Sequence, residues 1–275
     1  MTVRVRAYAK LNLSLRVVGR RKDGYHEILS DVQTIDLADR IEIELGGASL
    51  RVENDLSMSG PDIAERAATS LLEHKGAALG VSIRISKGIP AGAGLGGGSS
   101  DAAAVLAILD RLTPPSLPFE VLCDIGAALG SDVPLFLHGG RIRMRGRGER
   151  VSRRPGSPTW FVLVVPPVHC DTASIYARWD ARARDERTGE PALGENDLLE
   201  PALETHPALV PYHEAVASVG GLYRGMSGSG STFYAVFDGA AAAERARIEL
   251  SRRLADATVF VSRPTAYGHE RAEGP

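Results

Sequence analysis

Pro90-Ala-Gly-Ala-Gly-Leu-Gly-Gly-Gly-Ser-Ser-Asp101 is the stretch that decides the fold of this chain. Before it, apolar and polar residues alternate from Val81 to Ser86, which predicts a half-buried strand. After it, the apolar residues between Ala102 and Leu112 recur at helical spacing, which predicts a helix with one face on a core. Strand, glycine-rich bend and helix start together predict a cradle of free N–H groups at a positive dipole end, which suits phosphate.

Two better-known phosphate motifs do not fit this context. Gly92, Gly94 and Gly97 match the letters G-x-G-x-x-G, but the predicted helix runs into 113–118 and then another helical pattern. A dinucleotide-binding unit would instead continue into a second strand that ends in a ribose-binding acid. A Walker A loop would close with Gly-Lys-Ser or Gly-Lys-Thr, and this bend does not.

A flexible turn is the remaining alternative for the glycine bend. Five glycines between a strand and a helix carry a large conformational entropy cost, so we favour phosphate binding. Ser99 or Ser100 is expected to cap the helix. Asp101 would repel phosphates unless it faces away, acts as a cap or meets a cation.

Composition is that of an ordinary globular protein with room for about two domains: 275 residues, 44% hydrophobic and 24% charged. A net charge of −2 predicts no general affinity for nucleic acid or for an anionic membrane. Cys123 and Cys170 lack C-x-x-C spacing, so neither a disulfide framework nor a metal site is expected. The chain shows no signal-peptide core and no apolar run of membrane-spanning length, and we expect a cytoplasmic protein.

The periodicity of the chain predicts an α+β protein in which helices cover antiparallel sheet. Strands are expected over 3–17, 32–37, 41–45, 50–52, 81–86, 160–165, 232–237 and 258–261. Helices are expected over 61–75, 102–112, 119–129, 171–183, 196–203, 208–219 and up to 254, with a charged loop over 184–190. The Pro- and Gly-containing segment 153–158 is the best boundary, giving domains 1–155 and 156–275.

Polar residues within the first strand allow two interpretations. Lys10 and Asn12 point to the same side of that strand, and a solvated polar face is the more economical explanation than a site. Tyr25 and His26 follow the turn Lys22-Asp-Gly24 and form either a binding edge or an ordinary half-buried and surface pair.

Two further charged features remain open on the residues alone. Asp132, between two apolar elements, is either the cap of a short helix near Pro134 or a carboxylate held in a site. Arg141, Arg143, Arg145 and Arg147 alternate with Ile142, Met144 and Gly146. No aromatic residues lie between these arginines to stack on bases, so we expect one solvated strand face rather than a polyanion site.

Five motifs spread over nearly the whole chain carry a resemblance to a known family: Ala9-Lys-Leu-Asn-Leu13, Gly19-Arg-Arg-Lys-Asp-Gly-Tyr-His26, the stretch from Ile89 to Asp101, Gly130-Ser-Asp-Val-Pro134 and Ser227-Gly-Ser-Gly230. The chain resembles the small-molecule kinases of the GHMP superfamily, and within it those that act on a cytidylylated methylerythritol. The resemblance implies a ribosomal protein S5 domain 2-like N-terminal nucleotide domain, a ferredoxin-like C-terminal substrate domain and a cleft between them.

The resemblance also implies an activity and roles for individual residues. The γ-phosphoryl group of ATP would pass, with Mg²⁺, to the 2-hydroxyl of the methylerythritol unit in non-mevalonate isoprenoid synthesis. Lys10 and Asp132 would be the catalytic pair. The ATP phosphates would be wrapped by Pro90, Ala91, Gly92, Ala93, Gly94, Leu95, Gly96, Gly97, Gly98, Ser99 and Ser100. The substrate would be held by Asn12, Tyr25, His26, Tyr176, Gly228 and Gly230, with Tyr25 and Tyr176 against the cytosine faces and His26 hydrogen-bonded to it.

Three other functions compete with this expectation. Another GHMP-type kinase of mevalonate, homoserine or a sugar would give Tyr25 and His26 little to do, since its substrate lacks a base. A non-catalytic ligand-binding member should lack Lys10 or Asp132, and both are present. A nucleic-acid module built on the arginines of 141–154 is the most distant reading. The expected partners are small molecules only, and the protein is a monomer or a homodimer.

Overall fold

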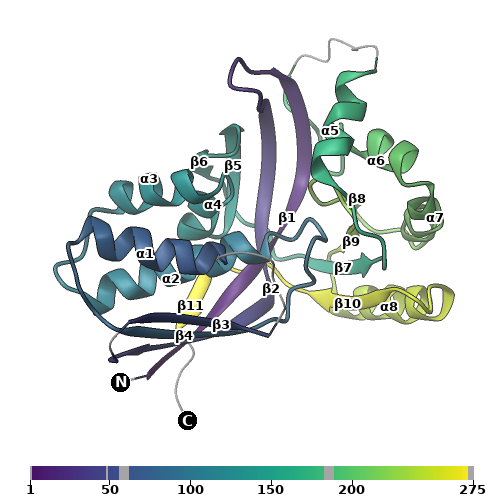
Figure 1. The fold of residues 1–275 in the computed structure, drawn as a ribbon. Coiled ribbons are helices and arrows are strands. Elements are labelled where there is room, and N and C mark those ends of the chain that lie inside the picture. The colour runs from purple at the N-terminus through teal and green to yellow at the C-terminus, as the bar shows by residue number, and fades with distance from the viewer. Residues whose placement is uncertain (1, 48, 56–61, 183–188, 272–275) are drawn as a thin grey trace.

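The computed structural model describes residues 2–47, 49–55, 62–182 and 189–271 (Figure 1). Pro61 and most of the expected charged loop, 184–188, lie outside these ranges. The elements are β1 (Thr2–Arg20), β2 (His26–Leu45), β3 (Leu50–Asn54), α1 (Ile63–His74), β4 (Val81–Ser86), α2 (Gly97–Leu112), α3 (Phe119–Leu129), α4 (Val133–His138), β5 (Arg141–Gly146), β6 (Arg150–Arg153), β7 (Trp160–Val165), α5 (Thr172–Asp180), α6 (Leu199–Thr205), the 3₁₀ turn Pro207–Leu209, α7 (Val210–Ser218), β8 (Tyr223–Met226), β9 (Phe233–Phe237), α8 (Ala240–Arg253), β10 (Thr258–Ser262) and β11 (His269–Arg271).

The chain forms two β-sheets with helices packed against each, which confirms the predicted α+β class. The first has seven strands, with β11-β1-β2-β4-β3 in order and β5 and β6 joined to the side of β2. The second has four strands in the order β10-β7-β9-β8. Helices α1–α4 gather on the first sheet, and α5–α8 lie with the second (Figure 1). Almost all pairings are antiparallel, the pairing of β3 with β4 being parallel.

The long hairpin of β1 and β2 stands between the two halves (Figure 1). Its strands are 19 and 20 residues long, so the predicted strands over 32–37 and 41–45 are one element. The buried apolar side chains of β1 belong to three different hydrophobic clusters along its length. Val3 and Val5 pack with α1 and α2, Leu11 and Leu13 pack with β7, and Leu15 packs with the C-terminal helices. One strand therefore fixes both halves of the molecule relative to each other.

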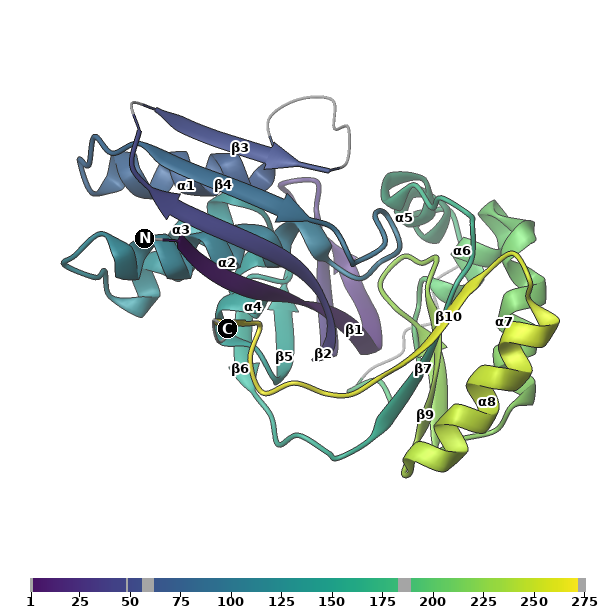
Figure 2. The ribbon, with the colours of Figure 1, turned by 90° about the horizontal axis from the view of Figure 1, so that it is seen from below.

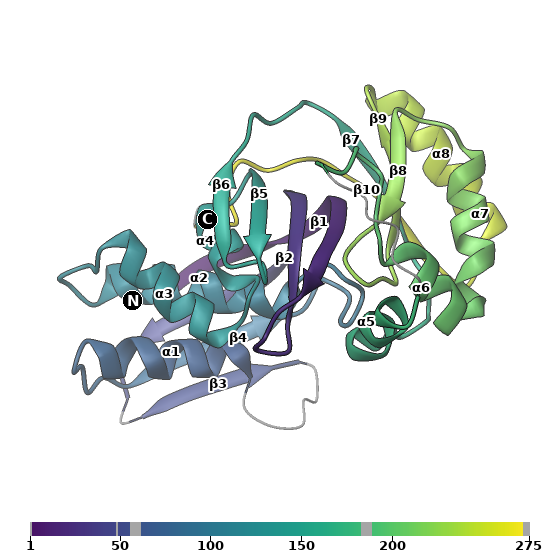
Figure 3. The ribbon, with the colours of Figure 1, turned by 90° about the horizontal axis from the view of Figure 1, so that it is seen from above.

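The end of the chain returns to the first sheet. After β10, residues 263–268 run back beside the connection between β6 and β7, and β11 pairs with β1 (Figures 2 and 3). The backbone N–H of Tyr8 donates to the Gly268 carbonyl along this path at 2.9 Å. The boundary predicted at residue 155 falls in the first of these two connections and stays a prediction.

The alternating arginines are a correction to the sequence analysis. Arg143 is 6% exposed and donates to Asp31 at 2.7 Å, and Arg141 donates to the other oxygen of Asp31 at 3.1 Å. Pairing of β5 with β2 places Arg143 opposite Asp31, and a buried carboxylate needs a cation. Of the four arginines in the run, Arg145 is exposed, Arg141 and Arg147 are half-buried and Arg143 is buried, so a single solvated face was the wrong expectation.

The described residues contain no helix long and apolar enough to cross a bilayer.

Candidate active site

The glycine bend joins β4 to α2 as predicted, and its backbone needs glycine at three points. Gly92, Gly94 and Gly96 have φ values of 66°, 75° and 73°, a region that L side chains rarely adopt. Gly94 is further constrained by space, because a Cβ there would lie 2.3 Å from the carbonyl oxygen of Ser227. The bend is therefore a close-packed structure and not a flexible turn.

The start of α2 differs from the expectation that a serine caps it. Gly96 occupies the N-cap position and no side chain accepts from the first turn. Ser100 instead donates its hydroxyl to the carbonyl of Tyr8 at 2.7 Å, and this bond ties α2 to β1. The first N–H groups of α2 consequently have no side-chain acceptor from the cap, which leaves them able to bind an anion.

Asp101 meets a cation, one of the three outcomes that would stop it repelling phosphate. Its carboxylate is 1% exposed and lies 2.6 Å from the ammonium of Lys87, at the root of the bend. Lys87 also pairs with the fully buried Asp39, whose other oxygen accepts from the backbone of Gly88 at 2.7 Å and of Ile89 at 2.8 Å. We call Asp39, Lys87 and Asp101 the root cluster.

The root cluster holds two acids and one base away from water. Burial, strengthened by the neighbouring Asp39, raises the pKa of Asp101 well above its ordinary value. Burial alone would lower the pKa of Lys87, but its pairs with Asp101 and Asp39 outweigh that effect and raise it. The cluster therefore fixes β2, the bend and α2 to one another without adding a free carboxylate beside the phosphates.

Lys10 and Asp132 come together beside this helix start. The ammonium of Lys10 lies 3.8 Å from a carboxylate oxygen of Asp132, with side chains 6% and 33% exposed. Asp132 is the N-cap residue of α4 by position, but its side chain caps nothing. Asp132 therefore does not cap α4 with its side chain but forms an ion pair with Lys10 of β1.

Lys10 and Asn12 are both 5% exposed, so the solvated face favoured from the sequence was wrong. The Lys10 ammonium donates to the Asn12 side-chain oxygen, and the Asn12 amide donates to Ser30 at 2.9 Å. Burial lowers the pKa of Lys10, and the Asp132 carboxylate opposes part of that shift. The cause of the burial lies far along the chain, in the turn that contains Gly228.

That turn, residues 227–232, covers Lys10 and the bend together. A Cβ at Gly228 would lie 3.5 Å from both the Lys10 ammonium and the Asn12 side-chain oxygen. Ser227 accepts from the Asn12 backbone at 3.2 Å and donates to the Gly94 carbonyl at 2.8 Å. Beside it, Gly230 packs against Cys170 and Met226. Gly228 therefore forms a wall of the site, and Gly230 supports that wall from behind.

The three ring-bearing candidates for binding the base, Tyr25, His26 and Tyr176, lie in two different surroundings. His26 stacks on Tyr176, with ring centroids 4.5 Å apart and an angle of 26° between their planes. Burial raises the pKa of Tyr176, and the charge of Asp132 adds to the shift. Tyr25 is 52% exposed, and the Arg147 guanidinium lies over its ring at 5.2 Å. His26 itself therefore covers one face of Tyr176, and among the described residues Tyr25 makes no ring contact with Tyr176.

Some residues around the site carried no sequence signal. Asn196 donates to the carbonyls of Met226 and Gly228, both at 2.8 Å, and so shapes the turn over Lys10. His169 borders Gly92, where a Cβ would lie 2.8 Å from its ring nitrogen. A cation near Asp101 was one of the three alternatives left open by the sequence, but which residue supplies it depends on how the end of β4 meets α2.

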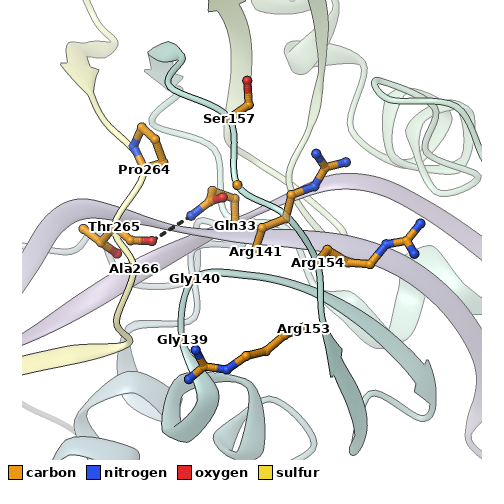
Figure 4. Close-up of a pocket in the computed structure, with 11 residues that line it drawn as sticks. Gln33, Gly139, Gly140, Arg141, Arg153, Arg154, Ser157, Pro264, Thr265 and Ala266 are labelled. Carbon is orange, nitrogen blue, oxygen red and sulfur yellow. Dashed lines mark hydrogen bonds between the residues drawn. The ribbon is translucent and has the colours of Figure 1, made fainter.

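A hollow of about 350 Å³ lies elsewhere, where the two connections between the halves run side by side. Arg141, Arg153 and Arg154 line it together with Gln33 and Thr265, and their guanidinium groups point to different sides (Figure 4). Gln33 shares the face of Leu11 rather than that of Lys10, because directly opposite residues of a strand pair project to one side. Neither Lys10 nor Asp132 lines this hollow.

Replacing Lys87 by methionine should lower the free energy of unfolding by about 3 to 5 kcal/mol, because two buried carboxyls lose the cation that they share. The loss should shrink in acid, because the pKa of Asp101 is raised and this carboxyl can then take up a proton instead of being buried as a charge. Denaturant unfolding at neutral and acidic pH measures both effects. The control Arg84→Met removes a cation that is 60% exposed on β4 and should cost about 1 kcal/mol or less. Equal losses in the two variants would contradict the role of the root cluster.

Comparison with known proteins agrees with this arrangement. The profile of the GHMP kinases N terminal domain matches residues 62–140, and that of the GHMP kinases C terminal domain matches residues 177–256. A 4-diphosphocytidyl-2-C-methyl-D-erythritol kinase of Solibacter usitatus (strain Ellin6076) is 39% identical over 85% of this chain and 80% of the relative. One of Geobacter sp. (strain M21) is 38% identical over 90% of this chain and 93% of the relative.

Solved structures extend the same likeness. A crystal structure of 4-(cytidine 5'-diphospho)-2C-methyl-D-erythritol kinase superimposes with a TM-score of 0.80 at 34% identity, over 96% of this chain and 99% of that one. A homoserine kinase from Cytophaga hutchinsonii ATCC 33406 superimposes with a TM-score of 0.78 at 16% identity, a likeness of fold. This chain belongs to the GHMP kinases, the ATP-dependent small-molecule kinases, and among them to the family of the 4-diphosphocytidyl-2-C-methyl-D-erythritol kinases.

Proposed function

We propose that this chain transfers the γ-phosphoryl group of ATP to the 2-hydroxyl of 4-diphosphocytidyl-2-C-methyl-D-erythritol. The observation that carries the proposal is the ion pair of Lys10 and Asp132 beside the uncapped start of α2. The helix start provides N–H groups for phosphates, and the ion pair provides a base and a cation for an alcohol. A kinase needs both within reach of one phosphoryl group.

The reaction follows from these two parts. The substrate hydroxyl attacks the γ-phosphorus in line, the new O–P bond forms, and the bond to the bridging oxygen of ADP breaks. Asp132 accepts the hydroxyl proton, which an alcohol does not give up unaided at neutral pH. The Lys10 ammonium stabilises the charge that develops on the transferred group. Its burial strengthens that effect, because little water screens it.

Mg²⁺ would be bound between the nucleotide phosphates and oxygen donors of the protein near the start of α2. Asp101 is neutralised in the root cluster, whereas Asp132 is one third exposed and Ser99 has no hydrogen-bond partner for its hydroxyl among the described residues. The Ser99 hydroxyl would contribute one oxygen to Mg²⁺, which in such sites takes most of its ligands from phosphates and water, and Asp132 would stay free to accept the proton. The ion would neutralise the charge of the phosphates.

The cytidylyl group is assigned to the end of the β1–β2 hairpin. Tyr25 offers an exposed aromatic face there, and His26 and Tyr176 lie on the side that leads to Asp132. The wall at Gly228, supported by Gly230, and the amide of Asn12 lie beside Lys10, where the alcohol would be held. A substrate without a base, such as mevalonate or homoserine, would leave the hairpin end unused, and this favours the cytidylylated substrate over these alternatives.

Turnover tests the proposal directly. ADP release should be seen with the cytidylylated methylerythritol and should be lower by orders of magnitude with mevalonate, homoserine or galactose. Activity on one of these instead would assign the chain to a different substrate on the same scaffold.

Asp132→Asn should lower kcat by about a hundredfold to ten-thousandfold, because the amide cannot accept the hydroxyl proton. The KM for ATP should change little, since the phosphates are held by the bend. Steady-state kinetics with both substrates measures this split. Asp124→Asn, an exposed change on α3, is the matched control and should leave both constants unchanged. An unaltered kcat in Asp132→Asn would remove this carboxylate from the reaction.

Tyr25→Ala should raise the KM for the cytidylylated substrate roughly five- to 150-fold, the range expected for loss of one base-stacking contact. The KM for ATP should stay the same. Tyr267→Ala, which removes a 60% exposed ring, serves as the control. If the substrate KM stays at the wild-type value, the base does not stack on Tyr25.

A further inference from the structure

One face of helix α5 holds the imidazole ring of His26 from three directions. Tyr176 stacks on the ring, Trp179 meets it edge-on with centroids 5.6 Å apart, and Asp180 lies 3.0 Å from its Nε2. Positions 176, 179 and 180 are spaced as i, i+3 and i+4, so they lie on one side of the helix. The imidazole is 11% exposed. Its orientation is therefore set by α5, which belongs to the other half of the chain.

The contact with Asp180 decides which nitrogen of His26 carries hydrogen. An ionised carboxylate can only accept, so Nε2 must be the donor of this bond. In a neutral imidazole the other nitrogen, Nδ1, is then an acceptor. Among the described residues, Nδ1 has no hydrogen-bond partner. The ring thus keeps one acceptor for a ligand.

Arg20 places a positive charge on the other side of the Asp180 carboxylate. Its guanidinium lies 3.8 Å from the second carboxylate oxygen, the one that does not face His26. Arg20 and His26 sit at the two ends of the turn between β1 and β2, so Asp180 also joins both sides of the hairpin end.

We propose that Asp180 is a positioning and specificity-determining residue, which makes His26 an acceptor toward the exocyclic amino group of the base and so favours cytosine over uracil. The inference rests on the proposed function, because it assumes a cytidylylated substrate. Uracil carries a carbonyl oxygen where cytosine has its amino group, and that oxygen would face the Nδ1 lone pair. With uracil bound, His26 Nδ1 would be left without a hydrogen-bond donor, and a binding site discriminates strongly against an analogue that leaves one of its buried polar atoms unpaired.

The test compares Asp180→Ala and Asp180→Asn with the wild type on the cytidylylated substrate and on its uridylyl analogue. For the cytidylylated substrate, KM should rise about tenfold with kcat nearly unchanged, as expected for one lost charge-assisted hydrogen bond. The preference for cytosine over uracil should fall by a similar factor. Glu204→Ala is the control, because this acid pairs with Arg178 and Arg182 and makes no contact with His26. A larger KM with an unchanged base preference would overturn the specificity role.

A spectroscopic measurement on the free protein separates positioning from catalysis. The ¹⁵N shifts of the His26 imidazole should show hydrogen on Nε2 in the wild type and in Glu204→Ala, and a mixture of tautomers in Asp180→Ala. If Asp180 acts through His26, Asp180→Ala should also have no further effect on KM in a His26→Ala background. Unchanged shifts, or full additivity of the two substitutions, would overturn the inference.

The two proposals fail in different ways. If the wild type does not phosphorylate the cytidylylated substrate, the proposed function is wrong whatever Asp180 does. If the wild type is active and the Asp180 variants match it in KM, base preference and imidazole shifts, the function stands and the inference is wrong.

Discussion

Close backbone approach at Gly94 is the constraint on which the rest of the site depends. The Ser227 carbonyl occupies the space in which a Cβ at Gly94 would lie, and Ser227 also bonds to the Gly94 carbonyl and to the Asn12 backbone. One serine therefore joins the phosphate bend, the strand that carries Lys10 and the turn from the C-terminal half. Any side chain at Gly94 would separate these three segments.

This contact explains why a lysine is buried on β1. The turn over residues 227–232 excludes water from Lys10, which lowers its pKa and makes the isolated charge costly. Asp132 and Asn12 offset the cost through an ion pair and a hydrogen bond. Under the proposed function, the same exclusion of water would strengthen the effect of these charges on a transferring phosphoryl group, so an arrangement that costs stability would favour the reaction.

Features set by local spacing could be predicted from the sequence. The glycine bend, its flanking strand and helix, and α3 with its end at Gly130 follow from residues close together in the chain. Gly130 itself is extended, with a φ of −173°, and ends the helix without a left-handed turn.

Features that depend on contacts between segments far apart in the chain could not be predicted from the sequence. Lys10 and Asn12 looked solvated because the turn that buries them is more than 200 residues away in the sequence. Arg143 looked exposed because Asp31 lies on another strand. Ser100 looked like a cap because its true partner, the Tyr8 carbonyl, is on β1. The family resemblance supplied the catalytic pair that the residue patterns alone left open.

Helix α5 connects the two ends of the site. Its Tyr176 ring packs on His26, and the charge of Asp132 contributes to the raised pKa of the Tyr176 hydroxyl. Under the proposed function, this side chain would lie between the base and the alcohol. Binding energy from a base at the hairpin end would then help to position an alcohol at Asp132, which is how a remote part of a substrate contributes to rate.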